Sequence, residues 1–194
     1  MGSASVQIGL LLVNALAGFF LFAVLLRFVL QAARADFYNP ISQFVVKATN
    51  PLVVPLRKII PGIGGLDWAA IVLMILVQIL AISLSLIIAG YDLPLASIAT
   101  WALLGTSGMF LKLYFWGLLI MIIASWLAPQ SYNPALLLLR QIMEPVMAPI
   151  RKVLPDMGGL DLSPIVLFLV INVFEIVLIS MARETGAPGF IIGL

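Results

Sequence analysis

The chain contains no cysteine and no histidine, and it has few charged residues. Without these two side chains there are no ligands for a Cys/His zinc site, an iron–sulfur cluster or a His-ligated haem. The chain can form no disulfide and has no thiolate for catalysis. Charged residues make up 9% of the 194 positions, whereas a soluble domain has roughly 25%. A phosphate-binding G-x-x-x-x-G-K-[ST] loop is also missing. We therefore expect no metal, no cofactor and no enzymatic activity.

Apolar residues are in excess, at 63% of the chain. They gather in four long stretches, at residues 8–31, 68–89, about 109–128 and 162–181. Each stretch has close to the ~20 residues with which a helix crosses a ~30 Å hydrocarbon core. No basic residue precedes the first stretch, so we expect it to be a retained helix rather than a cleaved signal peptide. The sequence predicts an all-α integral membrane protein with about four transmembrane helices.

The segment before the third apolar stretch allows three interpretations. Gly105-Thr106-Ser107-Gly108 interrupts the apolar pattern. Residues 95–108 are therefore a re-entrant segment, an interfacial segment or a part of the third transmembrane helix.

One segment of the sequence occurs twice, at an offset of 94 residues. Residues 38–73 and 132–167 share 15 identities without a gap, including Tyr-Asn-Pro, Pro-x-Arg-Lys and Gly-Gly-Leu-Asp. Such a duplication indicates one structural unit used twice, and we divide the chain into a first repeat at 1–92 and a second at 93–194. Because each repeat has an even number of transmembrane helices, the two copies have the same orientation. The predicted architecture is two parallel two-helix repeats.

The basic residues predict how the chain lies in the membrane. Seven of the ten lie between the two apolar stretches of one repeat or the other. The positive-inside rule places these loops in the cytoplasm. We therefore expect a multi-pass protein of the bacterial inner (plasma) membrane, with both termini in the periplasm.

Each repeated loop is expected to contain a short amphipathic helix at the cytoplasmic surface. Asn-Pro suits a helix start, with asparagine as the cap and proline at the first position. Pro51 and Pro145 are expected to end this helix, Gly-Gly provides a bend, and the following aspartate caps the next transmembrane helix or, alternatively, pairs with an arginine. The motif residues are Asn39, Pro40, Pro51, Pro55, Gly64, Gly65 and Asp67 in the first copy, and Asn133, Pro134, Pro145, Pro149, Gly158, Gly159 and Asp161 in the second.

The repeated basic turns are the candidate binding site. Arg57, Lys58, Arg151 and Lys152 follow the prolines in the two copies. At the cytoplasmic interface each basic residue can attract anionic lipid by about 1 kcal/mol. The alternative is that these residues only determine topology and snorkel at the ends of helices.

A few polar residues lie inside the apolar stretches. Glu175 and Lys112 reach similar estimated depths, and we expect an ion pair between them because an unpaired intramembrane carboxylate is costly. The alternatives for Glu175 are a protonatable or ion-binding site and an outer-interface carboxylate in contact with water. Gln78 and Asn172 occupy matching repeat positions, so we expect a hydrogen bond between helices rather than a substrate site. Arg27, near the inner end of the first helix, is expected to snorkel.

The duplicated pattern Tyr-Asn-Pro, Pro-x-x-x-Pro-x-Arg-Lys and Pro-x-x-Gly-Gly-Leu-Asp resembles that of the YggT/YlmG family of small bacterial membrane proteins with chloroplast relatives. Ser125-Trp126 also fits the family, whereas the first copy departs from it with Gln31-Ala32. The resemblance implies no enzymatic activity. It implies links to osmotic stress, ion homeostasis and cell division in bacteria, and to cytochrome haem attachment and membrane organisation in chloroplasts.

Two classes of function follow from these observations. The first is a non-enzymatic membrane scaffold or assembly factor, whose cytoplasmic basic loops contact anionic lipid or a protein partner. The second is a small oligomeric channel or transporter for ions, in which Gln78, Lys112, Asn172 and Glu175 line a path. Four helices enclose little of a pore, so the second function requires oligomers. No nucleic acid partner is expected.

Overall fold

The computed structural model describes residues 4–127, 131–154 and 161–194, and every element in these ranges is an α-helix. The helices are α1 (Ala4–Ala32), α2 (Pro40–Arg57), α3 (Trp68–Ala89), α4 (Leu95–Leu127), α5 (Pro134–Val153) and α6 (Ser163–Glu184). Of these, α1, α3, α4 and α6 are long and apolar enough to cross a membrane. The predicted all-α membrane protein with four spans is confirmed.

Helix α4 settles the three interpretations of residues 95–108, because those residues are its first turns. The helix continues without a break through Gly105-Thr106-Ser107-Gly108 to Leu127. Its 33 residues correspond to about 50 Å, which exceeds the ~30 Å hydrocarbon core. A tilted helix accommodates this length.

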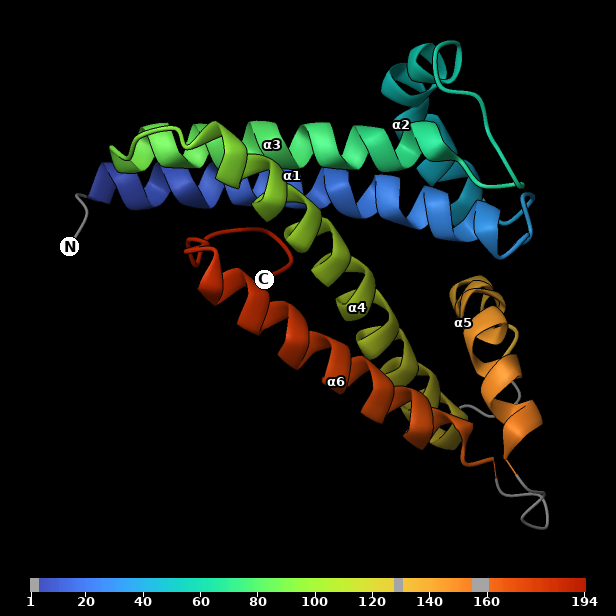
Figure 1. Cartoon of the computed structure of the whole chain (residues 1–194). Coiled ribbons are helices and arrows are strands. Elements are labelled where there is room, and N and C mark those ends of the chain that lie inside the picture. Colours follow the sequence, from blue (N-terminus) through green and yellow to red (C-terminus); the bar gives the residue numbers. More distant parts are fainter. Residues whose placement is uncertain (1–3, 128–130, 155–160) are drawn as a thin grey trace.

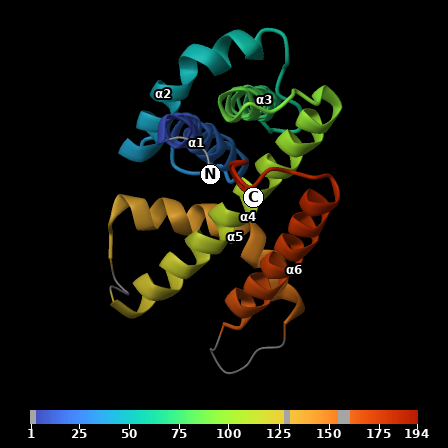
Figure 2. The same cartoon turned by 90° about the vertical axis from the view of Figure 1, so that its left-hand side faces the viewer.

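The spans form two antiparallel pairs, one from each repeat. Helices α1 and α3 lie side by side, and α4 and α6 form the second pair, which diverges from the first toward the end that carries α2 and α5 (Figures 1 and 2). We name that end the basic end. The first half of α4 returns across α3 and joins the repeats, since Trp101 and Ala102 pack in one cluster with Ile82 and Leu86. Both repeats therefore run in the same direction.

Helices α2 and α5 are amphipathic and begin as predicted. The Asn39 side chain accepts a hydrogen bond from the Ile41 N–H at 3.0 Å, and Asn133 accepts one from Ala135 at 2.9 Å. The buried face of α2 contains Val45, Thr49 and Val53. Proline at the first helical position follows each cap, where its missing N–H costs nothing.

The expectation that Pro51 and Pro145 end these helices is wrong. Both helices continue past them, and past Pro55 and Pro149, to Arg57 and Val153. All four prolines are exposed. The carbonyls that each proline leaves without a ladder partner are then accessible to water or lipid head groups, which lowers the cost of keeping the helix.

The predicted bend between α2 and α3 is present at Gly64 and Gly65. Their φ angles are +67° and +81°, a region that residues with a Cβ rarely adopt. The corresponding Gly158 and Gly159 lie outside the described residues.

After α6 the chain turns back between the two helix pairs, as Figures 1 and 2 show. We name residues 186–194 the return segment. The buried Gln78 donates to the Ile192 carbonyl at 2.7 Å, and Lys112 Nζ donates to a Leu194 oxygen at 3.0 Å. The return segment therefore supplies acceptors to two polar groups that lie inside membrane-spanning helices.

Two glycines of α4 make this close approach possible. A Cβ on Gly108 would overlap the Gly193 carbonyl, and a Cβ on Gly105 would overlap the Gln78 amide. Gly189 in the return segment has open space at the same position. The glycines that interrupt the apolar pattern of the sequence are thus a packing surface.

We predict that Gly108→Ala destabilises the protein by about 1–3 kcal/mol, because the methyl group must displace the return segment. Gly189→Ala is the matched control and is expected to be neutral. The free energy of unfolding in mixed micelles measures both. Equal stability of the two variants would show that the return segment does not pack against α4.

Candidate functional site

The basic end of the first repeat is organised around the carboxylate of Asp67, which is 1% exposed. Arg57 from α2 donates to both of its oxygens, with Nε–Oδ1 at 3.2 Å and Nη2–Oδ2 at 2.5 Å. Arg27 Nε from α1 lies 3.5 Å from Oδ2. This forked geometry is the strongest form of an arginine–carboxylate pair. Asp67 therefore joins α1 and α2 to the start of α3.

Arg27 completes this arrangement instead of snorkelling, so that expectation is wrong. Its side chain is 5% exposed, and Nη1 donates to Thr49 Oγ1 and Asn50 Oδ1, both at 2.8 Å. A buried charge needs such partners because leaving water is costly. We name Arg27, Thr49, Asn50, Arg57 and Asp67 the Asp67 clamp.

The predicted N-cap role of Asp67 is also wrong, and its alternative is confirmed. Asp67 stands at the cap position of α3, but its side chain makes no capping hydrogen bond. Both carboxylate oxygens are directed to arginines instead. A buried carboxylate gains more from two guanidinium groups than from one backbone N–H.

The second repeat contains the corresponding arginine–aspartate pair, but there the pair is exposed to solvent. Arg151 Nε lies 3.1 Å from Asp161 Oδ2, and Arg151 Nη1 lies 2.9 Å from Glu144. Asp161 does not occupy the predicted cap position, because the N-cap of α6 is Leu162; it accepts a hydrogen bond from the Ser163 N–H at 2.9 Å from one residue before the cap. Hydrogen bonding from Ser163, with Arg151 as a further cause, holds the pKa of Asp161 below its ordinary value. The bond to Glu144 raises the pKa of Arg151.

Three substitutions between the repeats explain this difference. At the positions of Arg27, Thr49 and Asn50, the second copy has Met121, Met143 and Glu144. Met143 is 1% exposed and belongs to the main apolar core. The second repeat therefore packs α5 through apolar side chains and leaves its ion pairs in solvent, where such pairs contribute little.

The four basic residues of the predicted binding site consequently have different roles. Arg57 and Arg151 are both held in ion pairs. Lys58 and Lys152 are exposed and have no ion pair among the described residues. The exposed lysines are accessible to a partner, whereas the arginines hold in place the helix ends that carry these lysines.

The repeats contact each other at the starts of their amphipathic helices. Asn39 Nδ2 donates to the Pro134 carbonyl at 2.9 Å, and the Asp36 N–H donates to Gln141 Oε1 at 2.9 Å. Asn39 thus caps its own helix and binds the first residue of α5. This contact fixes α2 and α5 relative to each other.

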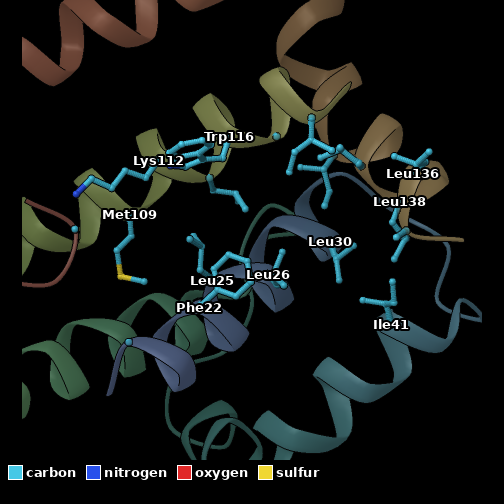
Figure 3. A pocket seen from close by; sticks show the side chains of 18 of the residues that line it. Phe22, Leu25, Leu26, Leu30, Ile41, Met109, Lys112, Trp116, Leu136 and Leu138 are labelled. Atoms are coloured by element: carbon cyan, nitrogen blue, oxygen red, sulfur yellow. The ribbon is translucent and has the colours of Figure 1, made fainter. Parts of the chain in front are cut away.

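Between the diverging helix pairs lies an apolar cavity of about 570 Å³. Figure 3 shows Phe22, Leu25 and Leu26 of α1 facing Trp116 of α4 across it, with Leu138 of α5 at one side. Lys112 lines the cavity at the edge nearest the return segment. Apart from Lys112 the lining side chains are apolar, as suits a space between membrane spans.

The intramembrane polar residues do not pair as expected. Lys112 donates to Leu194 rather than to Glu175, and no ion pair of the described residues contains Glu175. Gln78 donates to Ile192, while Asn172 donates to the Phe168 carbonyl of its own helix at 2.7 Å. Matching estimated depth and repeat position could not reveal that the return segment supplies acceptors to Gln78 and Lys112.

A double-mutant cycle tests the Asp67 clamp. We predict that Asp67→Asn costs about 3–5 kcal/mol, because it leaves the buried Arg27 without an opposite charge, and that Arg27→Met costs less, because Arg57 still pairs with Asp67. Their combined cost is expected to be smaller than the sum by more than 1 kcal/mol. Unfolding free energy in mixed micelles gives the four values.

The second repeat provides the control for this cycle. Arg151→Gln and Asp161→Asn remove the corresponding exposed pair, and their coupling is expected to stay within about 1 kcal/mol. Additive losses in the first repeat would refute the clamp.

Comparison with known proteins identifies relatives along most of the chain. A family model described as CCB3/YggT matches twice, at residues 6–88 and 100–182. An uncharacterised protein of Pseudomonas aeruginosa is 47% identical over 180 residues, covering 91% of this chain and 91% of its own length. The uncharacterised protein YggT of Escherichia coli is 43% identical over 165 residues, which cover 84% of this chain and 85% of the relative. No solved structure matches significantly.

Proposed function

The chain belongs to the CCB3/YggT family, and we propose that it acts as a non-enzymatic scaffold or assembly factor of the bacterial inner membrane. The observation that carries this proposal is the pair of basic amphipathic helices, α2 and α5, fixed to the same end of the four spans. Together they form a rigid surface for lipid or for a protein partner.

The fixed position of this surface supports a scaffold. The Asp67 clamp attaches α2 to α1 and α3, and Asn39 attaches α2 to α5. A helix that is held by buried polar contacts presents its exposed residues in a constant geometry. Partner binding then requires little ordering, which favours affinity.

Exposed basic residues indicate the chemistry of the partner. Lys47 of α2 and Arg140 of α5 are exposed, as are Lys58 and Lys152 at the ends of the two helices. Each basic residue near a negatively charged membrane surface contributes about 1 kcal/mol. We propose anionic lipid as the first partner of this surface and a membrane protein as the second.

The basic end is proposed to face the cytoplasm, because it carries seven of the ten basic residues in its loops and amphipathic helices. Finer roles in osmotic stress, ion homeostasis or cell division rest on the family resemblance alone. The alternative of an oligomeric ion channel is less favoured, because Gln78 and Lys112 donate to the return segment and Asn172 donates to its own helix.

Neutralising the exposed basic surface tests the lipid partner. We predict that changing Lys47, Lys58, Arg140 and Lys152 together to Gln removes the enrichment of phosphatidylglycerol around the protein. Four contributions of about 1 kcal/mol give a loss of up to about 10³-fold. Energy transfer from the tryptophans to labelled phosphatidylglycerol, relative to labelled phosphatidylcholine, measures this in a mixed bilayer.

A charge-conserving variant is the control, in which the three lysines become Arg and Arg140 becomes Lys. It is expected to enrich phosphatidylglycerol like the wild type. If phosphatidylglycerol were enriched around the Gln variant as it is around the wild type, the four basic residues would not bind lipid and would serve only to determine topology.

The absence of cysteine allows a direct test of topology. We predict that a cysteine at Asp92, exposed after α3, reacts with a membrane-impermeant maleimide in intact spheroplasts, whereas a cysteine at the exposed Gln43 reacts only after permeabilisation. The reverse labelling pattern would show that the protein has the opposite orientation in the membrane.

A further inference from the structure

A second cavity, of about 420 Å³, lies at the basic end of the first repeat. It is lined by the last turn of α1, the residues that follow it and the start of α2, and three arginines contribute to it: Arg27, Arg34 and Arg57. We name it the arginine pocket. Only Asp67 lies within ion-pair distance of any of these arginines among the described residues.

The hydrogen bonds of these arginines leave donors available. Arg57 uses Nε and Nη2 for Asp67 and Gln31, so Nη1 has no partner among the described residues. Arg27 uses Nη1, and its buried Nε faces Asp67 Oδ2 at 3.5 Å without forming a hydrogen bond, so the available donors are those of Arg34 and Arg57. Arg34 makes no side-chain hydrogen bond in this part of the chain and is exposed. The pocket thus combines excess positive charge with unused N–H groups.

The backbone at Arg34 adds an independent observation. Its φ is +51°, and it is the one non-glycine residue with positive φ among the described residues. The Ala35 N–H donates to the Leu30 carbonyl at 2.9 Å and so caps α1, which ends at Ala32. Glycine would adopt this conformation at lower cost. The left-handed cap residue therefore carries a guanidinium side chain, which lines the pocket.

The second repeat lacks this pocket's residues. At the positions of Arg27 and Arg34 the sequence has Met121 and Ala128, while Arg57 corresponds to Arg151. The arginine that the motif shares serves the ion pair in both repeats, and the two additional arginines belong to the first repeat alone. The pocket is therefore not a by-product of the duplicated loop.

We propose that the arginine pocket binds the phosphate group of an anionic phospholipid, with Arg34 and Arg57 as ligands above the buried Arg27. Guanidinium groups match phosphate oxygens in geometry and charge. Leu30 lines both this pocket and the apolar cavity, and the adjacent Ile41 and Ser42 line one each. A phosphate that carries apolar chains therefore fits this end of the molecule better than a free anion.

This inference rests on the proposed function for the lipid-facing position of the basic end, but it concerns one saturable site rather than the exposed surface. The test is the thermal unfolding of the detergent-solubilised protein during titration with phosphatidylglycerol, phosphatidylcholine or inorganic phosphate. Wild-type protein is expected to give a saturable rise in Tm with phosphatidylglycerol and little with phosphatidylcholine.

Arg34→Gln is expected to weaken this binding about tenfold, and Arg183→Gln, which removes an exposed guanidinium in the last turn of α6, outside both the pocket and the exposed basic surface, is the matched control. Ala35→Leu should fill the pocket without a change of charge and weaken binding similarly. Neither variant touches the Asp67 clamp, so both are expected to fold.

Several results would decide the proposal. Saturation by inorganic phosphate with the same dependence on Arg34 would support a phosphate site and identify free phosphate as a source. Equal responses to both phospholipids, or wild-type titrations for Arg34→Gln and Ala35→Leu, would overturn it. Loss of binding in Arg34→Gln but not in the fourfold Gln variant of the exposed surface would uphold the pocket while the surface proposal fails.

Discussion

A buried carboxylate at the end of a transmembrane helix determines the geometry of the first repeat. Asp67 is removed from water at the start of α3, and a charge in that position is stable only with opposite charges and hydrogen bonds around it. Arg27 of α1 and Arg57 of α2 supply them. The relative positions of three helices are thus set by one charge balance, and Thr49 and Asn50 fix the orientation of Arg27.

The two repeats share one motif and use it differently. The second copy keeps Arg151 and Asp161 but surrounds them with solvent, while Met143 fills the core where the first copy has Thr49. Both repeats contain the same loop motif, but the residues that pack under it differ. They are polar in the first repeat and include the apolar Met143 in the second. The result is a basic end that is continuous across both repeats, through Asn39 and Pro134, but chemically asymmetric.

The sequence predicts the elements well because their determinants are local. Apolar length defines the spans, and Asn-Pro defines the starts of α2 and α5. The sequence does not predict side-chain contacts that depend on residues far apart along the chain. In the sequence, Arg27 looks like any basic residue near a helix end, and only the structure places Thr49 and Asp67 beside it. Gln78 and Lys112 donate to acceptors that lie more than 80 residues away in the sequence. A signal for the clamp was available in the unequal positions of the repeat, at Arg27 and Met121.

The return segment also imposes an order on events during biosynthesis. Gln78 is separated by 114 residues from the carbonyl that it binds. Helix α3 therefore enters the bilayer before the segment that accepts a hydrogen bond from Gln78 Nε2 has left the ribosome. Until the return segment arrives, the amide and Lys112 need temporary partners, which water, lipid head groups or the insertion machinery must provide. The exchange of these partners for backbone acceptors of the protein itself can take place only once the return segment has been synthesised.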